Sequence, residues 1–223
     1  MHPTPRPTLS AMVLAGGHST RMGQDKALMR LPSGQTLLSQ TVTVARSLTA
    51  DIKIVTPWPE KYISSVSVKW VKEPLPVYEP ENRLTAGTRQ RSSAGPLSGF
   101  ACGMSQVSTD WCLLLACDMP YLEVDALQAW WRWIVASQQE GWLGRSQPVA
   151  SLSPMDDRQN PQRWEPLCGY YHRSCMHSLH QQANHGQRSF QAWLSTVPIA
   201  PYEAAPKRLF FNCNRPDDWP FES

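Results

Sequence analysis

Short apolar runs alternate along the chain with stretches of helical period. The β-rich or apolar runs cover residues 12–15, 52–56, 66–71, 111–117, 148–152, 167–172 and 208–213. Helical patterns cover residues 25–30, 36–48, 124–138, 174–184 and 189–194. Such alternation is typical of an open, mainly parallel sheet with helices on both faces. The pattern therefore predicts a three-layer α/β/α, Rossmann-like fold, with ligands beyond the carboxyl ends of the strands.

One long interruption breaks this pattern. Residues 74–94 carry prolines and scattered charge without apolar periodicity, which predicts a long loop. The loop is either an insertion without a role or a lid, in which Arg83, Arg89 and Arg91 close over an anionic substrate. Residues 1–9 are expected to be flexible, and residues 1–223 to form one domain.

Composition narrows the class of protein. With 223 residues and 41% hydrophobic composition, the chain can bury the core of one α/β domain. A formal charge of +3 does not favour nucleic-acid binding, although it suits a small anionic ligand. No stretch has the roughly 18 apolar residues of a membrane span, so a cytoplasmic protein without membrane partners is expected.

Two residue types could carry chemistry but more often serve packing. Six cysteines lack any C-x-x-C pair, which favours reduced thiols over metal ligands or nucleophiles. Trp130, Trp131 and Trp133 fall on one predicted helix, where packing is favoured over a stacking platform.

A glycine-rich loop follows the first predicted strand. Gly16 and Gly17 allow close approach of the backbone to a phosphate, and Arg21 and Lys26 add positive charge. The loop is neither a Walker A motif nor a G-x-G-x-x-G fingerprint. The residues favour a triphosphate site, with a glycine turn bearing surface basic residues as the alternative.

Two later polar positions could hold a metal ion. Asp118 follows the apolar run 111–117 directly, and Mg²⁺ commonly takes one or two carboxylates, with water and phosphate as further ligands. Asn212 and Asn214 lie at the end of the predicted strand 208–213, where a side-chain carbonyl could reach the same ion. Helix capping by Asp118 and an asparagine-rich turn are the alternatives.

Several motifs together resemble one family. Residues 14–26 resemble the L-A-G-G-x-S-x-R-M-G-x-D-K signature of the molybdenum cofactor guanylyltransferases, within the glycosyltransferase-A-like nucleotidyltransferases. The later matches, in order, are to G-P-L-x-G at 95–99, C-D-x-P at 117–120, P-L-x-x-x-Y-H-R at 166–173, the late helix at 186–194 and F-x-N-x-N-T-P-E-D at 211–218. The likeness covers nearly the whole chain.

The resemblance implies a reaction and a site. A terminal phosphate of molybdenum-bound molybdopterin would attack the α-phosphorus of GTP, releasing pyrophosphate and forming a guanine dinucleotide cofactor. Mg²⁺ would be the cofactor, Arg21, Lys26 and Asp118 would be catalytic, and Asn214 would join Asp118 as a metal ligand. The implied nucleotide-binding residues are Leu14, Ala15, Gly16, Gly17, Arg21, Lys26, Glu73, Gly95 and Asp118. Molybdenum-insertion enzymes or cofactor chaperones are further partners that the resemblance allows.

Departures from the family pattern keep other functions open. Glu73, where the family usually has an aspartate, is followed here by the long stretch 74–94, and Trp58 stands where asparagines often lie near the base. Trp58 either stacks on a heterocycle or packs on the surface. The alternatives are a molybdenum cofactor cytidylyltransferase, another sugar- or alcohol-phosphate nucleotidyltransferase, and a non-catalytic cofactor-delivery protein. The missing G-x-G-x-x-G disfavours a dinucleotide oxidoreductase.

Overall fold

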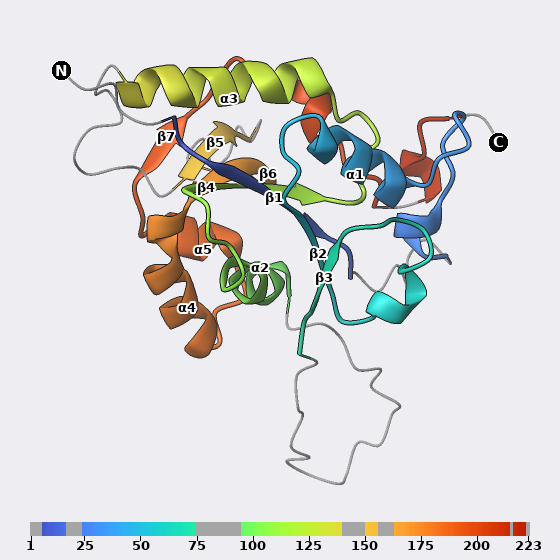
Figure 1. Ribbon diagram of the computed structural model, residues 1–223, viewed down its shortest axis with the longest axis horizontal. Coiled ribbons are helices and arrows are strands. Elements are labelled where there is room, and N and C mark those ends of the chain that lie inside the picture. The colour runs from blue at the N-terminus through green and yellow to red at the C-terminus, as the bar shows by residue number, and fades with distance from the viewer. Residues whose placement is uncertain are drawn as a thin grey trace, which may run out of the picture.

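A mostly parallel sheet forms the centre of the computed structural model (Figure 1). The structure describes residues 6–16, 24–74, 95–139, 150–155, 163–214 and 216–221. Within these ranges one sheet has seven strands. They are β1 (Leu9–Leu14), β2 (Ile52–Thr56), β3 (Lys69–Lys72), β4 (Trp111–Ala116), β5 (Ala150–Pro154), β6 (Trp164–His172) and β7 (Ile199–Pro201).

The strand order β3-β2-β1-β4-β6-β5-β7 places β1 and β4 side by side in the middle of the sheet. Only β6 runs against its neighbours, because it pairs antiparallel with both β4 and β5. Leu14 at the end of β1 lies level with Val55 of β2 and Ala116 of β4. The segments that follow these three strands therefore leave the sheet at one edge, where ligands bind in folds of this kind.

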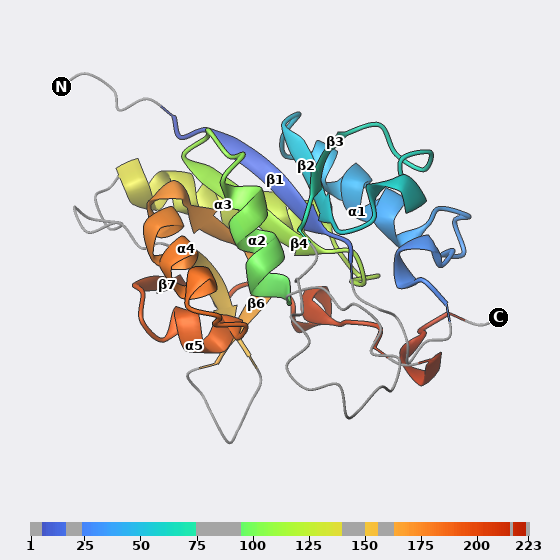
Figure 2. The same ribbon diagram turned by 90° about the horizontal axis from the view of Figure 1, so that it is seen from below.

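Helices cover both faces of the sheet. Helices α1 (Leu37–Arg46) and α3 (Val124–Gln139) lie on one face, and α2 (Pro96–Met104), α4 (Met176–Asn184) and α5 (Phe190–Leu194) lie on the other (Figures 1 and 2). Strand residues alternate between the two cores: Leu113 packs with Leu127 of α3, whereas Leu114 packs in the cluster of Phe100 and Trp193. This alternation follows from the two-residue period of a strand covered on both faces.

Close packing fixes the position of α2 against β1 and β2. A Cβ atom added to Gly103 would lie 2.5 Å from Met12 Sδ and 2.7 Å from a Val55 methyl. The small residue lets the helix approach the strands, so α2 is held near the edge where β1 and β2 end. Pro96 at the first turn of α2 matches the preference of proline for that position.

The predicted fold class is confirmed, whereas three local predictions are wrong. Residues 208–213 form no strand: the 3-10 helix η4 (Lys207–Phe210) takes up their first part, and in the irregular stretch that follows Asn212 Nδ2 donates to the Phe210 carbonyl, which a strand would pair with a neighbouring strand. The strand β7 was missed because it has three residues and ends in Pro201. Residues 25–30 form only the short 3-10 helix η1 (Lys26–Leu28), after which Arg30 pairs with Thr36.

The predicted loop and the predicted flexible N-terminus are described only in part. Apart from Pro74, the predicted loop of residues 74–94 lies outside the described residues, so its arginines and its lid role stay predictions. In the N-terminal segment, the Thr8 backbone N–H donates to Asp110 Oδ2 at 2.8 Å, and Leu9 begins β1. No described helix is long and apolar enough to cross a membrane.

Candidate active site

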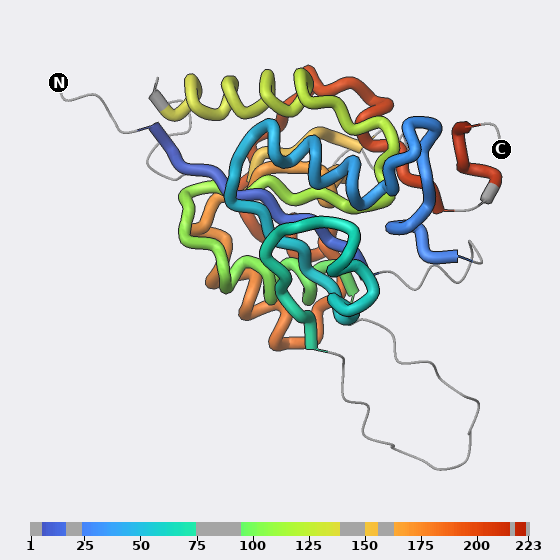
Figure 3. The backbone as a smooth tube through the Cα atoms, turned by 45° about the vertical axis from the view of Figure 1, so that its right-hand side comes forward, coloured from blue at the N-terminus to red at the C-terminus, as the bar shows by residue number. Residues whose placement is uncertain are grey.

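Three predicted site residues meet at the edge where β1 and β4 end. Lys26 Nζ lies 3.3 Å from Asp118 Oδ2 and 3.1 Å from Asn214 Oδ1. These residues come from three distant parts of the sequence, which Figure 3 shows running close together near the C-terminus. The side chains of Lys26 and Asp118 are 16% and 21% exposed, so their charges are partly shielded from water.

The aspartate before Lys26 holds the lysine backbone in place. Asp25 Oδ1 accepts a hydrogen bond from the Ala27 backbone N–H at 3.1 Å and thereby caps η1. Asp25 Oδ2 accepts from the Tyr62 hydroxyl at 2.7 Å. Burial of Tyr62, together with the Asp25 carboxylate, raises the pKa of the phenol far above its ordinary value, so Tyr62 stays a hydrogen-bond donor. No sequence pattern indicated Tyr62, which lies 37 residues from Asp25 along the chain.

Backbone hydrogen bonds bring Asn214 to Asp118. The Asp118 carbonyl accepts from the Cys213 N–H at 3.0 Å, and the Cys117 N–H donates to the Leu14 carbonyl at 3.2 Å. Asp218 Oδ2 then accepts from the Asn214 N–H at 2.8 Å and fixes the turn. Asp218 was missed as a positioning residue, because its hydrogen bond to the Asn214 backbone forms only in the folded chain.

The oxygen atoms of this cluster fit a magnesium ion. Asp118 Oδ2 and Asn214 Oδ1 both face the Lys26 ammonium, so a cation already lies between them. A carboxylate and an amide oxygen are hard ligands of the kind that Mg²⁺ accepts, with water and phosphate completing its shell. Among the described residues no group of three His, Cys, Asp or Glu side chains could hold a metal. A metal here would therefore depend on ligand phosphates.

Only part of the predicted phosphate loop is described. Leu14 ends β1, and the Ala15 N–H donates to the Val55 carbonyl at 3.0 Å, so the strand pairing continues one residue further. A Cβ atom on Gly16 would lie 2.7 Å from Pro57 Cδ, which explains why glycine is needed there. Gly17 and Arg21 lie outside the described residues, and their phosphate contacts stay predictions.

Glu73 and Gly95 lie beside α2 rather than in the Lys26 cluster. Glu73 follows β3, and its backbone N–H donates to the Thr56 carbonyl at 3.0 Å. Only 5% of the surface of Glu73 is exposed. Its Oε1 atom is buried without a hydrogen-bond partner among the described atoms, and burial raises the pKa of the carboxyl to about 7. A Cβ atom on Gly99 would lie 3.1 Å from Glu73 Oε2, while Gly95, with φ +99°, begins α2.

The structure favours packing for the remaining candidates. Trp130 is fully buried, donates from Nε1 to Ser151 Oγ at 2.8 Å and stacks on Tyr202 with 4.7 Å between ring centroids. Trp58 is partly exposed, with Lys61 Nζ 4.6 Å from its ring centroid. The six cysteines are free thiols, and burial raises the pKa of the Cys117 thiol beside Asp118 far above its usual value, which argues against a nucleophile.

The fold and the cluster of lysine, aspartate and asparagine at its strand edge define a nucleotidyltransferase of the α/β class. A family model described as "MobA-like NTP transferase domain" matches residues 11–198. The chain belongs to this family.

Relatives and solved structures agree with this assignment. The chain is 40% identical over 210 residues to a probable molybdenum cofactor guanylyltransferase of Trichormus variabilis, covering 94% of this chain and 88% of the relative. It is 36% identical to a protein of the same description from Synechococcus elongatus, with 94% and 95% covered.

Two solved structures share the fold. The crystal structure of molybdopterin-guanine dinucleotide biosynthesis protein A from Archaeoglobus fulgidus has a TM-score of 0.66 at 20% identity, with 94% of each chain covered. The 2-C-methyl-D-erythritol 4-phosphate cytidylyltransferase of Thermus thermophilus has a TM-score of 0.58 at 16% identity, again with 94% of each chain covered. These two likenesses show the fold alone.

Proposed function

We propose that the protein transfers GMP from GTP to a terminal phosphate of molybdenum-bound molybdopterin and releases pyrophosphate. The observation that carries this proposal is the convergence of Lys26, Asp118 and Asn214, with Lys26 Nζ 3.3 and 3.1 Å from the two oxygens. The names of the relatives in Trichormus and Synechococcus support guanine as the base and the molybdenum cofactor as the acceptor.

The proposed chemistry needs no protein nucleophile. An oxygen of the acceptor phosphate forms a bond to the α-phosphorus, and the bond from that phosphorus to the bridging oxygen of the leaving pyrophosphate breaks. Because a phosphate monoester is largely ionised at neutral pH, its oxygen requires little help from a general base. Positioning and charge stabilisation then carry most of the rate enhancement.

Each residue of the cluster has a defined part in this scheme. Asp118 and Asn214 would hold Mg²⁺ through one oxygen each, and Lys26 would turn its ammonium from these oxygens to the phosphates. The bound Mg²⁺ supplies positive charge to the phosphate oxygens. Arg21 and the backbone of Gly16 and Gly17 would contribute further neutralisation and N–H donors.

Glu73 is the proposed reader of the base, together with Gly95 at the start of α2. Guanine carries an N1–H and a 2-amino group side by side, and a carboxylate accepts from both. Cytosine lacks this pair of neighbouring donors on a ring nitrogen and an amino group, so Glu73 would favour GTP over CTP. Burial against Gly99 restricts the Glu73 side chain, which lowers the entropy cost of fixing it.

The setting of the reaction is proposed on the same grounds. The protein would act in the cytoplasm, where GTP is available, and would receive its acceptor from molybdenum-insertion enzymes or pass its product to cofactor chaperones.

Paired binding and transfer assays test the function. Thermal shifts with GTP, CTP, ATP and UTP in the presence of Mg²⁺ should show the largest stabilisation by GTP, because selective binding stabilises the folded state. Lys26→Ala should lose most GMP transfer, whereas Lys69→Ala, whose side chain is 76% exposed on β3, should retain it. A non-catalytic carrier would instead deliver cofactor equally well with either substitution, and that outcome would overturn the proposal.

A further inference from the structure

An aromatic segment near the C-terminus packs beside the Lys26 cluster. After the 3-10 helix η5 (Pro216–Asp218) come Trp219 and Phe221, whose rings meet edge to face with 5.4 Å between centroids. Both side chains pack against a small group of buried apolar residues, which are Met29, Leu31 and Leu37. In Figure 3 this segment, in red, lies beside the blue segment that follows β1. The aromatic side chains therefore cover the part of the chain that carries Lys26.

Backbone hydrogen bonds connect the apolar group to Lys26. The Met29 N–H donates to the Lys26 carbonyl at 3.1 Å and ends η1. The N–H of Leu37, which is fully buried at the start of α1, donates to the Met29 carbonyl at 2.9 Å. Because Met29 follows Lys26 by three residues, a shift of Met29 would move the backbone that presents the ammonium.

The same aromatic segment reaches the Asp118 turn through Tyr121. The centroid of the Tyr121 ring lies 6.1 Å from that of Phe221 and 5.7 Å from that of Phe211. Tyr121 follows Asp118 by three residues, and Phe211 precedes Asn214 by three. One tyrosine ring therefore joins the turn that holds Asp118 to the chain on both sides of Asn214.

The helix η5 connects these rings to Asn214. Asp218 Oδ2 accepts from the Asn214 N–H at 2.8 Å, and the Asp218 carbonyl accepts from the Cys213 thiol at 3.6 Å. Trp219 follows Asp218 directly, so the packing of its ring fixes the residue that holds the Asn214 turn. The three segments of the Lys26 cluster thus meet a second time, in a group of apolar and aromatic side chains.

The proposed reaction explains why a second meeting point is needed. In the structure the Lys26 ammonium bridges the oxygens of Asp118 and Asn214. In the proposed function the ammonium turns to the phosphates, so its link between the segments is lost when both oxygens must face Mg²⁺. Apolar packing does not depend on where the ammonium points, and a close-packed contact resists displacement. The aromatic rings can therefore keep the three segments in register through this change.

We propose that Tyr121, Trp219 and Phe221 form an aromatic clamp that positions Lys26 against Asp118 and Asn214 during GMP transfer. The inference rests on the proposed function, which gives the cluster its chemical role. The three aromatic residues are positioning residues, because they act through the backbone of the segments they join. Loss of the residues that support metal ligands typically costs about 10- to 100-fold in metal affinity or activity.

Substitutions that remove or keep a ring test the clamp in the full chain. Tyr121→Leu and Phe221→Leu remove ring contacts, whereas Tyr121→Phe keeps them. Trp133→Leu is the matched control, because Trp133 on α3 is also partly exposed and lies 5.4 Å from another aromatic ring. Each clamp leucine variant should lower kcat at saturating GTP and Mg²⁺ by about tenfold. Tyr121→Phe and Trp133→Leu should keep the parental kcat.

Manganese binding measures the same geometry without transfer. Binding of Mn²⁺ in the presence of GTP is followed through the electron paramagnetic resonance signal of free Mn²⁺. Tyr121→Leu and Phe221→Leu should each raise the Kd of Mn²⁺ by about tenfold, whereas Tyr121→Phe should leave it unchanged. The double leucine variant should bind about as weakly as either single variant, because both substitutions break one link.

Several results would overturn the proposal. These are parental kcat and Mn²⁺ affinity in a folded Phe221→Leu protein, an equal loss in Trp133→Leu, or effects that multiply in the double variant. If Tyr121→Leu does not fold, Phe221→Leu decides the question. No Mn²⁺ binding by the parental protein with GTP would overturn the clamp together with the metal site. Absent GMP transfer, with Mn²⁺ binding that still depends on Phe221, would refute the proposed function alone.

Discussion

The Lys26 ammonium lies 3.3 Å from the Asp118 carboxylate, across 92 residues of sequence. The pair joins the segment after β1 to the end of β4, and Asn214 approaches the same ammonium from the C-terminal part of the chain. Three segments thus bring opposite charges and side-chain oxygen atoms to one point at the strand edge.

Asp118→Asn should abolish most of the Mg²⁺-dependent activity. The substitution keeps the size of the side chain but removes the negative charge that the proposed metal requires, so kcat should fall on the order of 100-fold or more. Single-turnover GMP transfer at increasing Mg²⁺ concentration measures the effect. Asp125→Asn, at an exposed position in the first turn of α3, is the matched control and should keep the parental rate. A fully active Asp118→Asn protein would remove Asp118 from the mechanism.

Tyr62→Phe should impair catalysis through Asp25. The substitution removes the hydroxyl that donates to Asp25 Oδ2 at 2.7 Å, and Asp25 caps the turn that carries Lys26. A lost hydrogen bond to a charged group should reduce the free energy of unfolding by about 1 to 2 kcal/mol. Displacement of Lys26 should lower kcat at saturating GTP by about tenfold. Tyr202→Phe, at a tyrosine stacked on Trp130, should leave kcat unchanged. Equal kcat values for both variants would contradict a positioning role for Tyr62.

The pH dependence of stability should report on Glu73. Because burial raises the carboxyl pKa to about 7 in the folded protein, the unfolded chain ionises at lower pH and stability falls as pH rises between the two values. Above about pH 7 the loss in the free energy of unfolding is complete and is on the order of 3 kcal/mol. Glu73→Gln should therefore stabilise the ligand-free protein at about pH 8 and change little at about pH 4, as thermal unfolding would measure. Stabilisation of equal size at both pH values would contradict a raised pKa.

Gly16→Ala should strain the start of the phosphate loop. The new methyl group would lie 2.7 Å from Pro57 Cδ, and neither the proline ring nor the strand end can move freely. The free energy of unfolding should fall by about 1 to 3 kcal/mol, and the KM for GTP should rise. Adding Pro57→Ala removes the clash and should restore part of the stability in denaturant unfolding. If the effects of Gly16→Ala and Pro57→Ala on the free energy of unfolding were strictly additive in the double variant, the clash between the two residues would not be the cause of the lost stability.

The fold class and the central cluster of Lys26, Asp118 and Asn214 could be predicted from the sequence. The residues that hold this cluster in position could not. Asp118 could be predicted because it follows the apolar run of β4 directly, and the ends of parallel strands meet at one edge. Tyr62 and Asp218 could not, because their roles depend on hydrogen bonds formed only after the chain has folded. The segment 208–213 was misread because its apolar residues resemble a strand, whereas the hydrogen bond from Asn212 Nδ2 to the Phe210 carbonyl forms only in the folded turn.

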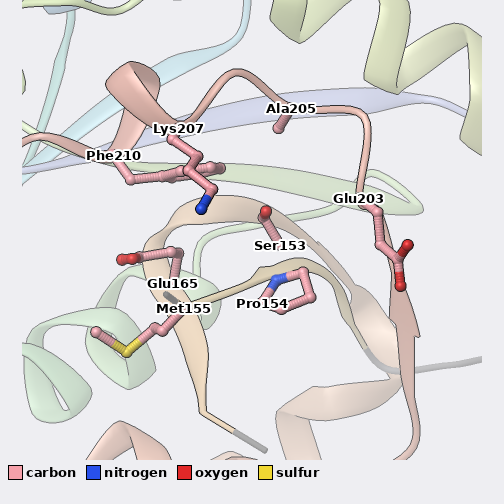
Figure 4. Close-up of a pocket in the computed structure, with 8 residues that line it drawn as sticks. All are labelled: Ser153, Pro154, Met155, Glu165, Glu203, Ala205, Lys207 and Phe210. Atoms are coloured by element: carbon pink, nitrogen blue, oxygen red, sulfur yellow. The ribbon is translucent and has the colours of Figure 1, made fainter. Parts of the chain in front are cut away.

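A pocket lined by Glu165, Lys207 and Phe210, among other residues (Figure 4), was also beyond the reach of sequence patterns. Its walls come from β5, β6 and the segment between β7 and η4, and no motif links these residues. Glu165 has no periodic or glycine-rich context, and only its burial beside Phe210 distinguishes it from a surface carboxylate.

Transfer of the labelled α-phosphate tests the central claim most directly. The purified protein is incubated with Mg²⁺ and molybdenum-bound molybdopterin, with either α-labelled GTP or α-labelled CTP as the donor. The account predicts a labelled guanine dinucleotide and one pyrophosphate per transfer, with little product from CTP and a large loss in Lys26→Ala. Product from CTP but not from GTP, or full transfer by Lys26→Ala, would contradict it.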